Sequence, residues 1–292
     1  HYPLRRQRQM CIRDRVINSS LKFIEMEIDE FLPDKIFTAT SVNNFEHLWR
    51  ISSKKKKIRV ESFVDHWTGI KKRFSFSNKI VYPDVIFLIN NEAKKIAISE
   101  GVPEEIILIN DNPYYSKVKN FKPNISRLSF FKDINVKPER KLILYISDKI
   151  RYSPIFSDLG FDELSIFENL LKSLYLLQNK KNDHLNGFTL MVKLHPRENE
   201  KKYLPYIRNN RNINIKLVKY CDPLVVNYFS DLVIGSFSNM VIESHLLKRP
   251  LLRVQIGIKA EDPLKYFELK DKFISSQREL NLRLKSIISN LI

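Results

Sequence analysis

The sequence predicts an α/β protein with two doubly wound, Rossmann-like domains, each built on a parallel sheet. Helix-like and strand-like segments alternate along the chain, which is the pattern of βαβ units. A polar stretch with three prolines, residues 113–140, interrupts the alternation and is the best linker candidate. The 292 residues also suffice for two cores of ordinary size. We therefore expect a first domain over 16–112, a second over 141–257 and a C-terminal helical segment over 258–292.

In the first domain, helical periodicity predicts the helices and short apolar runs predict the strands. Gly101 ends the third helix, as glycine commonly does. The expected elements are, in order, helix 17–31, strand 35–40, helix 45–51, strand 57–63, strand 85–89, helix 91–100 and strand 106–109.

The alternation is cleaner after the linker, where strands and helices follow one another without long gaps. This regularity predicts one parallel sheet. The expected elements are strand 141–147, helix 162–178, strand 189–194, helix 198–209, strand 213–218, helix 223–229, strand 231–235, helix 239–247, strand 251–256 and a final helix from Ser276.

Residues 1–15 are set apart from fold reasoning, because they lack a hydrophobic period and 10–15 resembles translated sequencing-adapter DNA. We expect a non-native or disordered segment here. The first domain is then expected to be incomplete, lacking its first strand, a glycine-bearing turn and an early helix.

The composition is that of a packed globular protein, with 43% hydrophobic and 28% charged residues. A net charge of +17 favours anionic partners. Because the positive charge is spread along the chain, solvated surface charge is favoured over a dedicated polyanion groove, and no specific nucleic acid is expected. The run 54–57 of four lysines reads as a solvated loop, with a membrane-surface or phosphate-facing role as the alternative.

Two cysteines, Cys11 and Cys221, lack metal-ligand spacing and indicate a reducing compartment. No stretch reaches the about 18 apolar residues that a spanning helix needs. We expect a cytoplasmic protein, with peripheral association at the inner face of the membrane as a further possibility. Six glycines form neither a GxGxxG nor a P-loop motif, which disfavours dinucleotide-binding and P-loop ATPase readings.

Open α/β sheets bind ligands at the carboxyl ends of their strands. The strand 189–194 delivers Lys193, His195 and Arg197 to such an end, with Pro196 starting the turn. Cations and an imidazole suit a leaving phosphate, which gains charge as a glycosidic bond breaks. The structural alternative is a proline that ends the strand and a histidine bonded to local backbone.

A second strand end is rich in hydroxyl groups. Ser236, Ser238 and Asn239 open the helix 239–247, where free backbone amides form a ready anion site. The alternative is an ordinary helix cap. Glu243, one turn further, has the spacing for a capping contact or for a ribose hydroxyl.

Together these two strand ends resemble the C-terminal lobe of GT-B glycosyltransferases from bacterial capsule and surface-polysaccharide synthesis. The likeness is to sialyltransferases and polysialyltransferases and, more loosely, to glycerophosphotransferases of teichoic-acid synthesis. In those families a Lys-x-His-Pro segment and a Ser-rich turn contact the donor's nucleotide and phosphate. The resemblance covers 141–257 and implies a GT-B-like fold with two lobes facing a cleft. It implies donor contacts for Lys193, His195, Pro196, Ser236 and Ser238.

Further candidates lie at other strand ends. Ser147 begins a loop after the first strand of the second domain, and this loop could close over the donor. In the first domain, Asp65 and His66 directly follow a strand and could deprotonate an acceptor hydroxyl. Trp67 could face a sugar ring, or it could be a core residue. Arg73 could face an acidic acceptor, or it could lie on a solvated helix face.

The leading hypothesis is a metal-independent glycosyltransferase that moves a sugar from a nucleotide-activated donor to a glycan or lipid-linked acceptor. The sequence has no Asp-x-Asp motif, and neither a metal nor a cofactor is expected beyond the nucleotide-sugar co-substrate. One alternative is a GT-B-like epimerase or glycerophosphotransferase. Another is a non-catalytic or polyanion-binding module, which predicts salt-sensitive binding without turnover.

Overall fold

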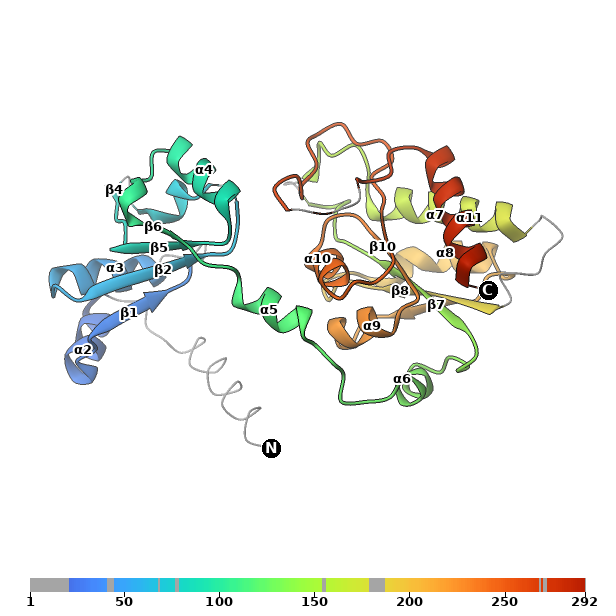
Figure 1. The fold of residues 1–292 in the computed structure, drawn as a ribbon, viewed down its shortest axis with the longest axis horizontal. Coiled ribbons are helices and arrows are strands. Elements are labelled where there is room, and N and C mark those ends of the chain that lie inside the picture. Colours follow the sequence, from blue (N-terminus) through green and yellow to red (C-terminus); the bar gives the residue numbers. More distant parts are fainter. Residues whose placement is uncertain are drawn as a thin grey trace. The chain divides into compact units, whose positions relative to one another are not determined.

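The computed structural model describes residues 21–40, 45–67, 69–76, 79–153, 156–178, 187–267, 269 and 272–291. The segment 1–15 and the start of the predicted helix 17–31 lie outside these residues. The chain divides into two compact units, unit 1 over His1–Asn112 and unit 2 over Pro113–Ile292. Each unit is an α/β structure with its own parallel sheet (Figure 1).

Unit 1 contains a four-stranded sheet of order β1-β2-β5-β6, in which every pair is parallel. Helices α2 and α3 pack against each other, and the core includes Ile24 and Ile28 of α2 with Val60 and Ile86 of the sheet. Two short strands form an antiparallel hairpin beside the sheet. The elements are α2 (Leu21–Phe31), β1 (Lys35–Thr38), α3 (Phe45–Lys55), β2 (Arg59–Val64), η1 (Lys71–Phe74), β3 (Ser75–Phe76), β4 (Lys79–Ile80), β5 (Val85–Leu88), α4 (Asn91–Ser99), η2 (Glu104–Ile106) and β6 (Ile107–Ile109).

Unit 2 contains a five-stranded parallel sheet of order β11-β10-β7-β8-β9. The strand order reverses beside β7: the next two strands of the chain, β8 and β9, lie on one side of β7, and the last two, β10 and β11, lie on the other side. The elements are α5 (Pro113–Lys119), α6 (Arg127–Asp133), β7 (Lys141–Ile146), α7 (Glu163–Gln178), β8 (Phe188–Lys193), η5 (Glu200–Tyr203), α8 (Leu204–Asn209), β9 (Ile215–Val218), α9 (Pro223–Phe229), β10 (Leu232–Gly235), α10 (Asn239–Leu246), β11 (Leu251–Arg253) and α11 (Gln277–Leu291).

Helices cover both faces of this sheet (Figure 1). Alternate residues of β7 point to opposite faces, as a strand requires. Ile143 and Tyr145 join a core with α7 and α11, whereas Leu142 and Leu144 join a core with α6, α9 and α10. Because both faces of the sheet are covered, we expect a ligand to bind at its carboxyl edge.

The stretch 113–140, which the sequence suggested as a linker, carries α5 and α6 and belongs to unit 2. Pro113 stands at the first position of α5, where a missing amide hydrogen costs nothing. The Ser126 hydroxyl caps α6 by accepting from the Ser129 amide. Proline and serine are also frequent in loops, so the starts of these two helices could not be distinguished from a loop in the sequence.

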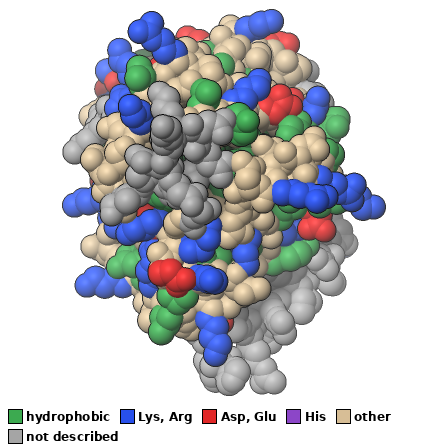
Figure 2. All heavy atoms as spheres, turned by 90° about the vertical axis from the view of Figure 1, so that its right-hand side faces the viewer, with side chains coloured by type: hydrophobic (Ala, Val, Ile, Leu, Met, Phe, Trp, Pro, Cys, Tyr) green, Lys and Arg blue, Asp and Glu red, His purple; other side chains and the backbone are tan. Residues whose placement is uncertain are grey.

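The positive charge is dispersed on the face drawn in Figure 2. Lys and Arg side chains are scattered there among apolar and neutral surface, with a few acidic groups between them. The described part of this face therefore shows no continuous basic stripe of the kind that long polyanions need.

Candidate functional site

The candidate site lies at the carboxyl edge of the unit 2 sheet, at the reversal of strand order beside β7. Open α/β sheets form their ligand crevices at such a switch point. Three strand ends meet there: β7 continues into Ser147 and Asp148, β8 into His195, and β10 into Ser236 and Ser238.

The turn from β10 into α10 is tight and partly unsatisfied. An added Cβ on Gly235 would lie 2.8 Å from Val241 Cγ2, so glycine allows the turn to sit close to its helix. Ser238 is the N-cap of α10, but among the described residues its hydroxyl makes no capping hydrogen bond and faces the Asp148 carboxyl without forming a well-formed bond. A helix N-terminus with an unused cap is suited to an anion.

The Ser236 hydroxyl does not reach this turn. It is buried and donates to Val254 O at 3.0 Å, which ties β10 to the residue after β11. The expected direct phosphate contact from Ser236 is therefore corrected to a structural role. Asn239 is exposed at the start of α10 and stays a candidate contact.

Asp148 faces the same turn and was missed by sequence reasoning. Burial, together with the charges of Glu198 and Glu163, raises the pKa of Asp148 to about 7. The Ser238 hydroxyl and the Phe237 amide favour the charged form of Asp148. Within the described residues, however, neither Asp148 Oδ2 nor Ser238 Oγ makes a well-formed hydrogen bond. The effect of burial on the pKa of Asp148 therefore dominates. A carboxyl whose pKa lies near neutrality thus stands beside the turn that opens α10.

His195 presents one defined ring nitrogen. Its Nδ1 accepts the Arg197 backbone N–H at 3.1 Å, and its own backbone N–H donates to Glu198 Oε2 at 2.6 Å. Burial is the main cause that lowers the pKa of His195. The negative charge of Glu198 raises this pKa, whereas the positive charges of Arg197, Lys149 and Lys193 lower it. With Nδ1 occupied as an acceptor, the neutral ring carries its proton on Nε2, which is a donor for a phosphate oxygen.

Lys193 is turned into the protein. It is 5% exposed, and its Nζ donates to Leu194 O at 3.0 Å and to Lys219 O at 2.9 Å. The expected phosphate grip by Lys193 is therefore corrected: the ammonium joins the ends of β8 and β9 and contributes only its field. Pro196 and Arg197 are exposed on the following turn and stay candidate contacts.

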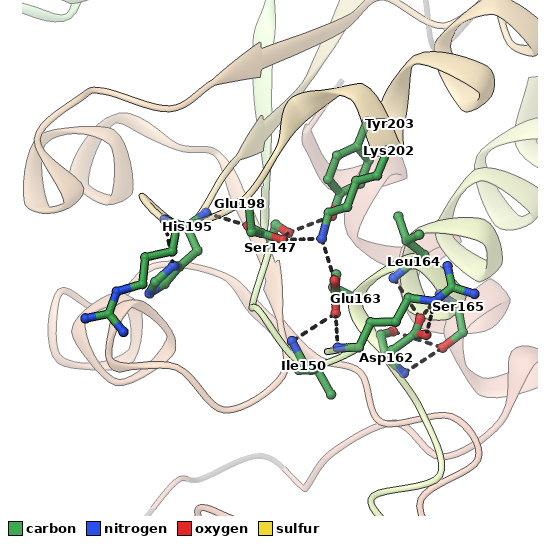
Figure 3. Close-up of polar contacts among 12 residues, drawn as sticks. Ser147, Ile150, Asp162, Glu163, Leu164, Ser165, His195, Glu198, Lys202 and Tyr203 are labelled. Atoms are coloured by element: carbon green, nitrogen blue, oxygen red, sulfur yellow. Dashed lines mark hydrogen bonds and ion pairs between the residues drawn. The ribbon is translucent and has the colours of Figure 1, made fainter. Parts of the chain in front are cut away.

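A buried ion network supports these loops (Figure 3). Lys202 lies between Glu163 and Glu198, whose side chains are each 1% exposed, and pairs with both. Glu163 Oε2 also accepts the backbone N–H groups of Ile150 and Arg151 at 3.0 and 2.9 Å. The loops after β7 and β8 are thus fixed through one lysine.

Ser147 belongs to this network and not to the ligand surface. Its hydroxyl lies 2.8 Å from Glu198 Oε1 and 2.6 Å from the Tyr203 hydroxyl, and the residue is 3% exposed. The expected donor contact from Ser147 is corrected to a support of Glu198, which in turn holds the His195 backbone.

Glu243 is buried and already engaged. It accepts from the Tyr114 hydroxyl at 2.7 Å and from Asn227 Nδ2 at 3.3 Å, and burial raises its pKa. Tyr114 comes from α5, 129 residues earlier in the chain. The carboxylate is held by two donors and does not cap α10, and the expected ribose contact stays a prediction.

The first-domain candidates stand in unit 1, after β2. Asp65 and His66 are exposed at the surface. Partial desolvation of the imidazole ring, together with the positive charge of Arg73, lowers the pKa of His66. Trp67 is 6% exposed and donates to Asn90 Oδ1 at 3.3 Å, so the expected open face for a sugar ring is corrected to a core position. Arg73 is half-buried and donates to Thr40 O at 3.2 Å.

The part of the chain that the structure describes contains no group of three or more His, Cys, Asp or Glu side chains that could hold a metal ion. None of its helices is long and apolar enough to cross a membrane.

Comparison with solved structures identifies the fold. UDP-GlcNAc 2-epimerase from Methanocaldococcus jannaschii is similar over 92% of this chain and 74% of its own, with 15% identity and a TM-score of 0.62. UDP-GlcNAc 2-epimerase from Neisseria meningitidis, bound to UDP-GlcNAc, is similar over 92% and 71%, with 13% identity and a TM-score of 0.62.

HepE from Anabaena, in complex with UDP-glucose, is similar over 92% of this chain and 73% of its own, with 13% identity and a TM-score of 0.55. No protein-family model matches the sequence, and no curated protein matches it. The chain has a GT-B-like α/β fold.

Removing Lys202 tests the buried ion network. Lys202→Met leaves Glu163 and Glu198 buried without their shared cation, so we expect the free energy of unfolding to fall by about 3–5 kcal/mol. Urea denaturation followed by circular dichroism measures the loss. Lys201→Met, at an exposed neighbouring lysine, is the matched control and should change stability by less than about 0.5 kcal/mol. Equal effects of the two substitutions would contradict the network's role.

Asp148 makes stability depend on pH. Its folded-state pKa of about 7 lies above the unfolded value, so its contribution is present at acid pH and is lost as pH rises toward 7. Asp148→Asn should remove this loss, with a difference up to on the order of 4 kcal/mol between about pH 4 and pH 7. Urea titrations across this range measure it. The exposed Asp158→Asn should keep the wild-type pH profile, and an unchanged profile in Asp148→Asn would refute the assignment.

Proposed function

We propose that the chain is a nucleotide-sugar enzyme that holds a UDP-sugar at the carboxyl edge of the unit 2 sheet. The observation that carries the proposal is the uncapped N-terminus of α10 after β10 at the switch point, with His195 following β8 on the other side of β7. The α10 amides and the Nε2–H of His195 would bind phosphate oxygens, and Glu243 would accept a ribose hydroxyl. Arg197 and Asn239, exposed on the two turns, would add contacts from solvent.

For the reaction, epimerisation at C2 of the sugar is the first candidate. It is supported by the similarity in fold to UDP-GlcNAc 2-epimerases, of which one is bound to UDP-GlcNAc. Glycosyl transfer to a glycan or lipid-linked acceptor is the second candidate. Asp65 and His66 support it, since a transferase needs a base for the acceptor hydroxyl and both are exposed after β2.

Isotope exchange separates the two reactions. Epimerisation must break the C2–H bond, so incubation with UDP-GlcNAc in deuterium oxide should place deuterium at C2 and produce the 2-epimer, as seen by proton NMR. Glycosyl transfer leaves C2–H intact and releases UDP only when an acceptor is present. Absence of C2 exchange together with acceptor-dependent UDP release would replace the first candidate by the second.

Binding tests the site independently of the reaction. His195→Ala should weaken UDP binding roughly ten- to hundredfold, because a hydrogen bond to a charged phosphate is worth about 1.5–3 kcal/mol. Isothermal titration calorimetry measures the change. His245→Ala, in α10 and packed against Phe267, is the control and should retain wild-type affinity. If neither UDP nor UDP-GlcNAc binds the wild-type chain, the nucleotide site itself is wrong.

Glu243 should account for recognition of the ribose. The wild-type chain is expected to prefer UDP over its 2′-deoxy or 3′-deoxy analogue, and Glu243→Gln should reduce that preference about tenfold. Tyr114→Phe should reduce it as well, because the Tyr114 hydroxyl orients the carboxylate. Tyr115→Phe keeps the neighbouring ring that packs against Phe267 and should behave as wild type. An unaltered preference in Glu243→Gln would exclude the ribose contact.

A further inference from the structure

Unit 1 contains a buried arginine whose hydrogen-bonding capacity is largely unused. Arg50 of α3 is 1% exposed. Its Nη2 lies 2.9 Å from His47 Nδ1 and 3.4 Å from Arg73 O, and its guanidinium lies 5.1 Å from the Phe74 ring centroid. Within the described residues, Arg50 Nε and Nη1 have no hydrogen-bond partner.

This arrangement is costly without an anion. Burial lowers the pKa of Arg50 to about 10, so the side chain keeps its charge at neutral pH. No carboxylate of the described chain forms an ion pair with it, although Glu46 on the same helix contributes a favourable field. Each buried donor left without a hydrogen bond destabilises the fold, and packing against Phe74 offsets this loss only in part.

Hydrogen bonds through Arg73 connect Arg50 with Thr40, which lies two residues beyond the end of β1. Side chains of a helix lean toward its N-terminus, and α3 begins after β1 ends. Thr40, just past β1, is buried, and its hydroxyl has no partner within the described part of the chain. Arg73 binds the Thr40 carbonyl with one guanidinium nitrogen and accepts from Arg50 with its own carbonyl. Thr40, Arg50 and Arg73 are thus linked.

Two histidines lie near Arg50 and Arg73. His47 is buried, and its burial and the charge of Arg50 lower its pKa. His66 is exposed at the surface, and partial desolvation of its ring and the charge of Arg73 lower its pKa. The acidic groups that act on these histidines are Glu46 and Asp65. Arginine is the residue that most often binds carboxylates and phosphates in buried settings.

We propose that Arg50 and Thr40 form an oxyanion site in unit 1, which takes the carboxylate or phosphate group of a second ligand. The unpaired guanidinium nitrogens and the Thr40 hydroxyl donate to the anion. Arg73 holds the loop that carries Thr40. The site is built from residues of unit 1 alone.

Intrinsic fluorescence reports on this unit selectively, because both tryptophans, Trp49 and Trp67, lie in unit 1. Sodium phosphate and sodium acetate, each balanced with sodium chloride to constant ionic strength, are titrated while thermal unfolding is followed by tryptophan emission. A saturable rise in Tm, roughly 5 °C near saturation, is expected with at least one of the two anions. The anion that produces it identifies the ligand group.

Arg50→Met should abolish this shift and should also raise Tm in chloride alone, because an apolar side chain replaces a buried unpaired charge. Arg59→Met removes an arginine of β2 that pairs with Glu61 at 2.9 Å, and should retain the shift. Thr40→Val should reduce the shift. No saturable shift in the wild type, persistence of the shift in Arg50→Met, or a lower Tm of Arg50→Met in chloride would each overturn the proposal.

Discussion

The candidate site depends on Lys202, which neutralises two buried carboxylates from different segments. Glu163 binds backbone amides of the loop after β7, and Glu198 binds the backbone of His195 and the hydroxyl of Ser147. Two carboxylates at such burial would repel each other without a shared cation. The position of the His195 backbone therefore depends on a buried ion pair.

The same region carries a carboxyl group whose charge, when ionised, has the same sign as that of the proposed ligand. Asp148 stands beside the turn that opens α10, so a diphosphate bound there would favour the protonated carboxyl. Linkage is reciprocal, and protonation of Asp148 would in turn favour the diphosphate. Because burial brings this pKa to about 7, a small change in pH alters the occupancy of the proton at the site. His195, whose pKa is lowered, remains a neutral donor over the same range.

The sequence predicts the sheet well and the side chains less well. The strand predicted over 189–194 is β8, displaced by one residue, because apolar runs bounded by turns report buried strands directly. Helices α5 and α6 are short, and their starts at Pro113 and after Ser126 also mark loops. Lys193 lies at the predicted strand end, yet its ammonium bonds carbonyls that only the folded sheet supplies. The pairing of Tyr114 with Glu243 spans 129 residues and leaves no local signal.

The buried polar groups without partners are distributed unevenly over the described part of the chain. Eight residues carry such atoms, and four of them, Thr40, Asp148, Ser238 and Gln255, lie within three residues of the carboxyl end of a strand. A native fold satisfies nearly all buried polar groups, so exceptions require a reason. Their concentration at the edges where open α/β sheets bind ligands indicates that these edges are built for molecules that complete them. The unpaired atoms differ in kind between the units: Arg50 in unit 1 has two guanidinium nitrogens without a partner, and Asp148 in unit 2 has one carboxyl oxygen without a partner. Both proposed ligand groups are anions, but the anion in unit 1 would be recognised by the charge of Arg50, whereas the turn in unit 2 would rely on amides and a neutral imidazole.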